Sequence, residues 1–101
     1  MKVTITIRHE KLDGHVKDYA TEKAEGITRY FEKITKINLI LDVKGIYQCV
    51  EIITSIPRGG TLVSHAKDKE IKSAIDKAAL KMEHQLSKLK SKIVDKHHGK
   101  K

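Results

Sequence analysis

A row of basic side chains recurs through the last third of the chain at the spacing of one helix face. Successive members are four, three, four and four residues apart, and at 100° per residue all five fall within about 80° of arc. Like charges at such spacing repel one another, and a helix selected for stability alone would interleave glutamates. The row therefore indicates an anion-binding surface, with a merely solvated lysine face as the alternative. We call it the lysine stripe, and its members are Lys77, Lys81, His84, Lys88 and Lys92.

The lysine stripe is expected to lie beside the apolar face of its helix rather than opposite it. Its mean direction is about 100° from the centre of the apolar positions, so the stripe should border the core. Lys72 and Lys90 lie on the other border, where Glu83 partly balances them. Asp76 is expected to tune the electrostatics of the helix surface.

A further basic residue, Lys23, falls among the apolar positions of an earlier helix, which include Ala20 and Ile27. An unpaired charge in a core is strongly unfavourable, so Lys23 is expected to extend to a nearby edge. If the two helices lie side by side, Lys23 and the lysine stripe would line one positively charged groove suited to a sugar–phosphate backbone. The alternative is that Lys23 extends to solvent for stability alone.

The positive charge of the chain is unevenly distributed. The formal net charge is +8, of which residues 1–60 carry +2 and residues 61–101 carry +6. Such concentration suggests a polyanionic partner, with an inert basic surface as the alternative. Aromatic residues make up 4% of the chain, too few for a sheet that stacks bases. Recognition of nucleic acid is therefore expected to depend on backbone and shape.

Side chains that could support catalysis or hold a metal occur without the partners that such sites need. The pair His97–His98, with His84 or His9, lacks a cysteine or carboxylate to complete a tetrahedral set. Cys49 is expected on the outer face of a sheet and has no evident base partner. Gly59–Gly60 is explained by a turn rather than a phosphate-binding loop. We therefore expect no enzymatic activity, no metal and no cofactor.

Length and composition favour one globular domain. The chain has 101 residues, of which 39% are hydrophobic and 34% charged. No apolar run approaches the roughly 20 residues that span a bilayer, and the N-terminus alternates instead of forming a signal sequence. Cys49 is the only cysteine, which fits a reducing compartment. We expect a cytoplasmic protein with no membrane partner.

Hydrophobic periodicity predicts the elements that must position these residues. Period-two alternation predicts strands at about 2–7, 37–43, 47–56 and 62–66, with a turn at Pro57–Gly60. The 3.6-residue period predicts one helix from an Asp13 cap to about Lys33 and another over 69–94, capped by Asp68. On the first helix, Tyr19, Tyr30 and Phe31 are expected in the core, which leaves Tyr47 as the exposed aromatic.

The resulting order, β-α-β-β-β-α, predicts an α+β fold. A four-stranded sheet with one apolar face, covered on that face by two helices with one apolar stripe each, forms a two-layer sandwich. We expect this domain to span residues 1–94. Residues 95–101 are expected to form a short, flexible basic tail.

Several segments, in this order, resemble one family. They are the opening strand ending in Arg8-His9, the segment from Lys23 through Arg29-Tyr30-Phe31-Glu32, the Gly59-Gly60 hairpin, and Ser73-Ala74-Ile75-Asp76 followed by the lysine-rich helix. The chain is similar over about residues 2–94 to the short ribosome hibernation promoting factors, also called ribosome-associated inhibitors or the S30EA-type family.

That resemblance implies a fold like that of double-stranded-RNA-binding domains and a function on the ribosome. It implies that the chain binds 16S-type rRNA in the mRNA and tRNA channel of the small ribosomal subunit during stress, excludes mRNA and tRNA, and is a monomer off the ribosome. The residues expected to face RNA are Lys23, Arg29, Lys77, Lys81, His84, Lys88 and Lys92, with Arg8 and His9.

Two departures from the family pattern bear on function. His84 stands where relatives often carry arginine, so that contact should be weaker or pH-sensitive. The chain ends soon after the second helix, which puts self-driven ribosome dimerisation in doubt. Two alternative functions stay open: a stand-alone double-stranded-RNA-binding domain, and an interaction module whose lysines meet an acidic protein.

Overall fold

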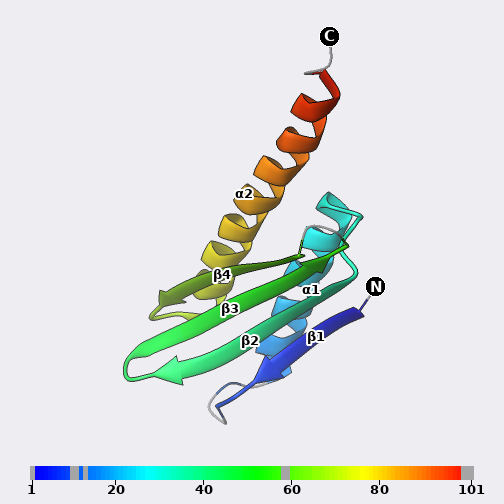
Figure 1. Ribbon diagram of the computed structural model, residues 1–101. Helices are drawn as coiled ribbons and strands as arrows, with labels where there is room; N and C mark the ends of the chain where they lie inside the picture. Colours follow the sequence, from blue (N-terminus) through cyan, green and yellow to red (C-terminus); the bar gives the residue numbers. More distant parts are fainter. Residues whose placement is uncertain (1, 10–11, 13, 58–59, 99–101) are drawn as a thin grey trace.

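The computed structural model describes residues 2–9, 12, 14–57 and 60–98, with residues 91–98 described by their backbone alone. The order of elements is β-α-β-β-β-α, which confirms the predicted α+β fold (Figure 1). The elements are β1 (Lys2–Ile7), α1 (Gly14–Tyr30), β2 (Lys36–Lys44), β3 (Tyr47–Ile56), β4 (Gly60–Asp68) and α2 (Ile71–His98).

The four strands form one mixed sheet in the order β1-β2-β3-β4. β1 and β2 run parallel because α1 carries the chain back between them, whereas the two hairpins make the other pairs antiparallel. In the register, Ile5 pairs with Leu39, Leu39 with Ile52, and Ile52 with Ser64. The same face of every strand is therefore directed at the helices.

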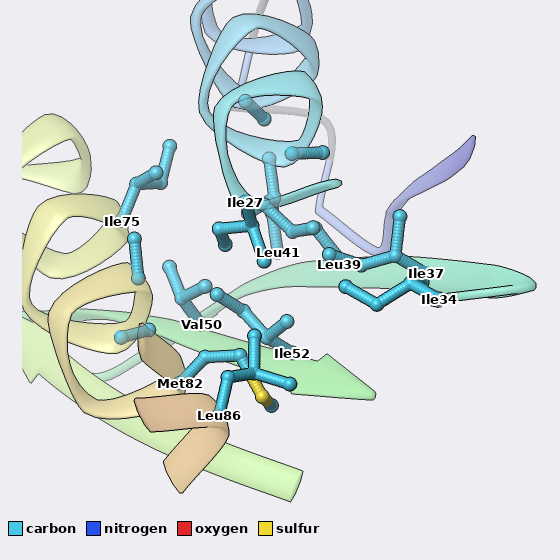
Figure 2. Packing of buried hydrophobic residues seen from close by; sticks show 14 of the residues in the cluster. Ile27, Ile34, Ile37, Leu39, Leu41, Val50, Ile52, Ile75, Met82 and Leu86 are labelled. Carbon is cyan, nitrogen blue, oxygen red and sulfur yellow. The ribbon is translucent and has the colours of Figure 1, made fainter. Parts of the chain in front are cut away.

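Both helices cover that one face, α1 over β1 and β2 and α2 over β3 and β4 (Figure 1). The inner positions of β2 and β3 are buried as the alternation predicts. Figure 2 shows that side chains from both helices point into the same core as these strand residues. The labelled members are Ile27, Ile34, Ile37, Leu39, Leu41, Val50, Ile52, Ile75, Met82 and Leu86.

Two glycines with positive φ begin or close the hairpins. Gly45, at φ 63°, turns the chain between β2 and β3, and Gly60, at φ 76°, begins β4. The other predicted turn glycine, Gly59, lies outside the described residues.

The helix ends differ from prediction by a few residues. α1 ends at Tyr30 rather than near Lys33, because Ile34 must turn toward the core and its N–H donates to the carbonyl of Phe31 (3.4 Å). The predicted cap of α1, Asp13, lies outside the described residues. α2 continues to His98 instead of ending near residue 94, since no glycine or proline interrupts it before position 99.

The aromatic residues only partly follow prediction. Phe31 is buried, but Tyr19 is half-buried and Tyr30 is 39% exposed, so the expectation that all three are core residues was wrong. Tyr30 is the last residue of α1, where the helix face leaves the core, and its ring is covered instead by the Lys90 ammonium at 4.8 Å.

Two buried hydroxyls on the inner face of the sheet provide a test of the packing. The Thr54 hydroxyl has no hydrogen-bond partner among the described residues, whereas the Ser64 hydroxyl donates to the Ala78 carbonyl at 2.9 Å. A buried polar group without a partner costs about 1–3 kcal/mol. Thr54→Val should therefore raise the free energy of unfolding measured in urea, while Ser64→Ala should lower it by about 1 kcal/mol. Destabilisation by Thr54→Val would show that its hydroxyl has a partner.

Candidate nucleic-acid interface

The first half of the lysine stripe lies along the flank of α2 that faces β4. The Lys77 ammonium donates to Asp68 Oδ2 at 2.7 Å, and the Lys81 ammonium donates to the His65 carbonyl at 2.8 Å. One turn further, Gln85 Nε2 donates to the Val63 carbonyl at 2.8 Å. Three side chains of α2 thus reach down to the same edge strand.

Asp68 joins the end of β4 to the beginning of α2. Its Oδ1 accepts the N–H of Glu70 at 3.0 Å while its Oδ2 accepts from Lys77. The first hydrogen bond of α2 runs from the N–H of Ala74 to the carbonyl of Glu70, so Glu70 occupies the cap position. Asp68, the predicted cap, instead caps the turn that precedes the helix. The hydrogen bond from Lys77, followed by that from the Glu70 backbone, lowers the pKa of Asp68 below its ordinary value of 3.8.

The opposite flank of α2 faces α1 and carries a different set of groups. Asp76 Oδ1 accepts the Tyr19 hydroxyl at 2.6 Å and lies 3.2 Å from the Lys23 ammonium. The Tyr19 ring lies beneath two cations, with Lys72 at 5.3 Å and Lys23 at 5.6 Å from its centroid. We call these four residues the inter-helix cluster: Tyr19, Lys23, Lys72 and Asp76.

Lys23 does leave the core, as its position on the helix required. Its side chain is 41% exposed and reaches the edge of α1 next to α2. The hydrogen bond to Asp76 raises the pKa of Lys23 above 10.5, and the bond that Asp76 accepts from the Tyr19 hydroxyl raises the pKa of Tyr19 above 10.0. The ammonium is therefore fixed by a carboxylate on the partner helix.

The expectation that Lys23 and the lysine stripe line one inter-helix groove is wrong. Lys23 contacts the α1-facing flank of α2, whereas Lys77 and Lys81 bind atoms of β4 on the other flank. The physical reason is that α2 packs over β3 and β4, so its two flanks border different neighbours. A helical wheel gives the angle between stripe and core but does not identify the neighbour on each side.

The other residues predicted to face RNA lie on α2, near the end of α1 and after β1. His84 and Lys88 are exposed on α2, and Arg29 is exposed near the end of α1. The side chain of Lys92 lies outside the described residues. Arg8 and His9 follow β1, with Arg8 exposed and His9 half-buried.

Sequence analysis missed three contributors to these surfaces. Tyr19 was expected in the core, although its spacing of four from Lys23 places the two side chains together on α1 and could have shown the contact. Asp76 was read as a surface residue of α2, and its bonds to α1 depend on how the helices pack. Gln85 went unnoticed because an amide reaching a strand carbonyl leaves no trace in periodicity.

Within the described part of the chain, no three histidine, cysteine, aspartate or glutamate side chains are grouped as metal ligands would be. No helix among the described residues is long and apolar enough to cross a membrane.

With this geometry established, comparison with known proteins identifies the family. A sequence profile of the family described as Sigma 54 modulation protein / S30EA ribosomal protein matches residues 3–94. The chain belongs to this family. Membership in the S30EA family confirms the resemblance drawn from the residues, and the match spans all six elements of the fold.

Relatives in the S30EA family cover almost the same length. A ribosome hibernation promoting factor of Pseudomonas putida is 36% identical over 92 residues, which are 91% of this chain and 89% of the relative. That of Azotobacter vinelandii is 29% identical over 99 residues, covering 98% of this chain and 92% of the relative.

Solved structures agree on the fold. A ribosomal subunit interface protein from Coxiella burnetii superposes with a TM-score of 0.81 at 22% identity, covering 90% of this chain and 99% of that one. The N-terminal domain of Thermus thermophilus Protein Y gives a TM-score of 0.75 at 23% identity, covering 88% and 99%.

The Asp68–Lys77 contact predicts a specific acid response. Because the folded-state pKa of Asp68 is lowered, the contact stabilises the fold at pH above 3.8 and is lost as pH falls through the folded pKa. In wild type, the urea concentration at half-unfolding should fall as the pH is lowered from 5 to 2. This fall should be smaller in Asp68→Asn, and Lys77→Gln should reduce it in part. An acid response of Asp68→Asn identical to wild type would contradict this assignment.

Proposed function

We propose that this chain is a ribosome hibernation factor that binds the small ribosomal subunit, occupies its mRNA and tRNA channel and holds idle ribosomes inactive. The observation that carries the proposal is the 36% identity, along 91% of the chain, to a protein named ribosome hibernation promoting factor. We propose further that the protein acts in the cytoplasm, is a monomer off the ribosome, and inhibits by exclusion rather than by catalysis.

The chemistry of binding would be the pairing of ammonium groups with RNA phosphates. Such contacts release counterions and carry little sequence information, which suits a factor that needs one shape rather than one sequence. The proposed RNA-facing residues are Lys77, Lys81, His84, Lys88 and Lys92 on α2, Lys23 and Arg29 on α1, and Arg8 and His9 after β1.

The local partners of the stripe lysines are compatible with this role. An ammonium has three donors, so Lys77 and Lys81 can keep their bonds to β4 and still donate to a phosphate. The bonds to Asp68 and to the His65 carbonyl also restrict the rotamers of two flexible side chains. Less side-chain entropy would then be lost when RNA binds.

Removal of two stripe charges tests the proposal. Lys77→Gln/Lys88→Gln should weaken co-sedimentation with purified small subunits and reduce the log–log salt slope by roughly 0.7–0.9 for each lost phosphate contact. The matched control is Lys17→Gln/Lys33→Gln, which removes the same charge from exposed positions on and just after α1.

The proposal is wrong if the chain does not co-sediment with small subunits at moderate salt. Tight binding to free duplex RNA in the same assay would then favour a stand-alone double-stranded-RNA-binding domain. If subunits are bound but the Lys77→Gln/Lys88→Gln slope equals that of the control, the lysine stripe is not the interface.

His84 offers a gain of function. The side chain is exposed in the lysine stripe, one turn from Lys81 and Lys88, and an arginine there would add a permanent charge and a fork of donors suited to phosphate. His84→Arg should strengthen subunit binding at pH 7.5 and steepen the salt slope by up to about 0.9. The control is His84→Gln, and equal binding by the two variants would place His84 outside the interface.

A further inference from the structure

The face of the sheet away from the helices carries an open hollow of about 560 Å³. Strand alternation assigns most of its walls to this face, because residues between them, such as Leu41 and Ile52, point into the core. The hollow is also lined by Val50 and Ala66, which occupy inward-facing positions of β3 and β4. We call it the sheet hollow, and the charged and polar side chains around it are Arg8, Asp42, Lys44, Cys49, Glu51, His65, Lys67 and Lys81.

The strand register places most of these groups in two rows across the sheet. Asp42 pairs with Cys49, and Cys49 with Lys67, so these three form one row. Arg8 continues this row at the β1 side, where its N–H donates to the Leu41 carbonyl at 2.8 Å. The row therefore has a cation at each end.

A second row lies beside it and also crosses three strands. Ile40 pairs with Glu51, and Glu51 pairs with His65. Lys44 lies two residues beyond Asp42 on β2, on the same face, at the hairpin end of the hollow.

Cations outnumber anions in the sheet hollow, and each carboxylate lies beside a neighbouring group of the sheet. Asp42 Oδ1 accepts the N–H of Val43 at 2.8 Å, and Glu51 Oε2 lies 3.7 Å from His65 Nε2. The cations Arg8, Lys44 and Lys67 are exposed and form no ion pair within the part of the chain that the structure describes. Their charge is therefore available to an external anion.

The sheet hollow meets the lysine stripe at one residue. Lys81 belongs to the stripe on α2, bonds the His65 carbonyl on β4, and also lines the hollow. Because β4 is the edge of the sheet, no further strand separates the two surfaces. The positive surface thus passes from α2 around β4 to the outer face.

The contacting groups favour a phosphate backbone as occupant. Ammonium and guanidinium groups donate hydrogen bonds and accept none, which matches phosphate oxygens. Beside the hollow, Tyr47 is 38% exposed and its ring lies beneath the Lys67 ammonium at 4.9 Å, which adds a flat surface on which one unpaired base could stack. Continuity with the stripe favours the same RNA on both surfaces.

We propose that the sheet hollow is a second phosphate-binding surface, in which Arg8, Lys44 and Lys67 hold RNA that also contacts α2 through Lys81. The inference rests on the proposed function and extends it to the face of the sheet opposite the helices. The domain would then be held between two RNA contacts rather than docked by its helices alone.

The test removes two charges from the sheet hollow. Lys44→Gln/Lys67→Gln should reduce the log–log salt slope of binding to small subunits by about 1.4–1.8 when both lysines contact phosphate. The control is again Lys17→Gln/Lys33→Gln. All four positions are exposed, so thermal unfolding should be close to wild type in both variants.

The pattern of slopes separates this inference from the proposed function. If Lys44→Gln/Lys67→Gln matches the control while Lys77→Gln/Lys88→Gln loses slope, the sheet hollow does not bind RNA but the proposed function stands. If the chain does not bind subunits at all, the proposed function itself fails.

A cross-linking arm identifies the partner of the hollow directly. A benzophenone attached through Lys67→Cys, in a Cys49→Ser background, should cross-link to ribosomal RNA after irradiation on the subunit. The same probe on Lys17→Cys should cross-link far less to RNA. Cross-linking from position 67 to ribosomal protein alone would overturn the inference and assign the hollow to an acidic protein segment.

Discussion

The position of α2 over β3 and β4 is the constraint on which the rest of this structure depends. Ile75, Met82 and Leu86 are completely buried against the inner face of the sheet, and this burial fixes the rotation of the helix about its axis (Figure 2). Once that rotation is fixed, every polar position on α2 has a defined neighbour. One flank borders β4, the other borders α1, and the remaining face is open to solvent.

The two flanks are chemically different because their neighbours are different. Toward β4, lysines meet backbone carbonyls and Asp68 at the end of the strand. Toward α1, Asp76 meets a tyrosine hydroxyl and Lys23, so its carboxylate offsets part of the positive charge of Lys23 and Lys72 there. The charge of Lys77, Lys81 and Lys88 is consequently displayed on the β4 side and the solvent face, not between the helices.

Much of the fold could be predicted from sequence because it depends on local periodicity. Alternation located β2 and β3 and their buried faces, and the 3.6-residue period located the buried positions of both helices. Which strands each helix covers could not be predicted in this way. The partner of Lys23, the hydrogen bond of Lys81 and the sheet hollow depend on which strand lies beside which helix. A helical wheel contains no such information. The early end of α1 at Tyr30 likewise follows from where Ile34 must be buried.

The bonds from α2 to β4 have a consequence for self-association. An edge strand of nine residues presents backbone groups with which another strand could pair, and such edges promote aggregation. In this chain, Lys81 and Gln85 already occupy the carbonyls of His65 and Val63. An approaching strand would have to displace an ammonium and an amide before its own N–H groups could bond there. Lys81 therefore obstructs strand pairing at this edge as well as contributing charge to the surface.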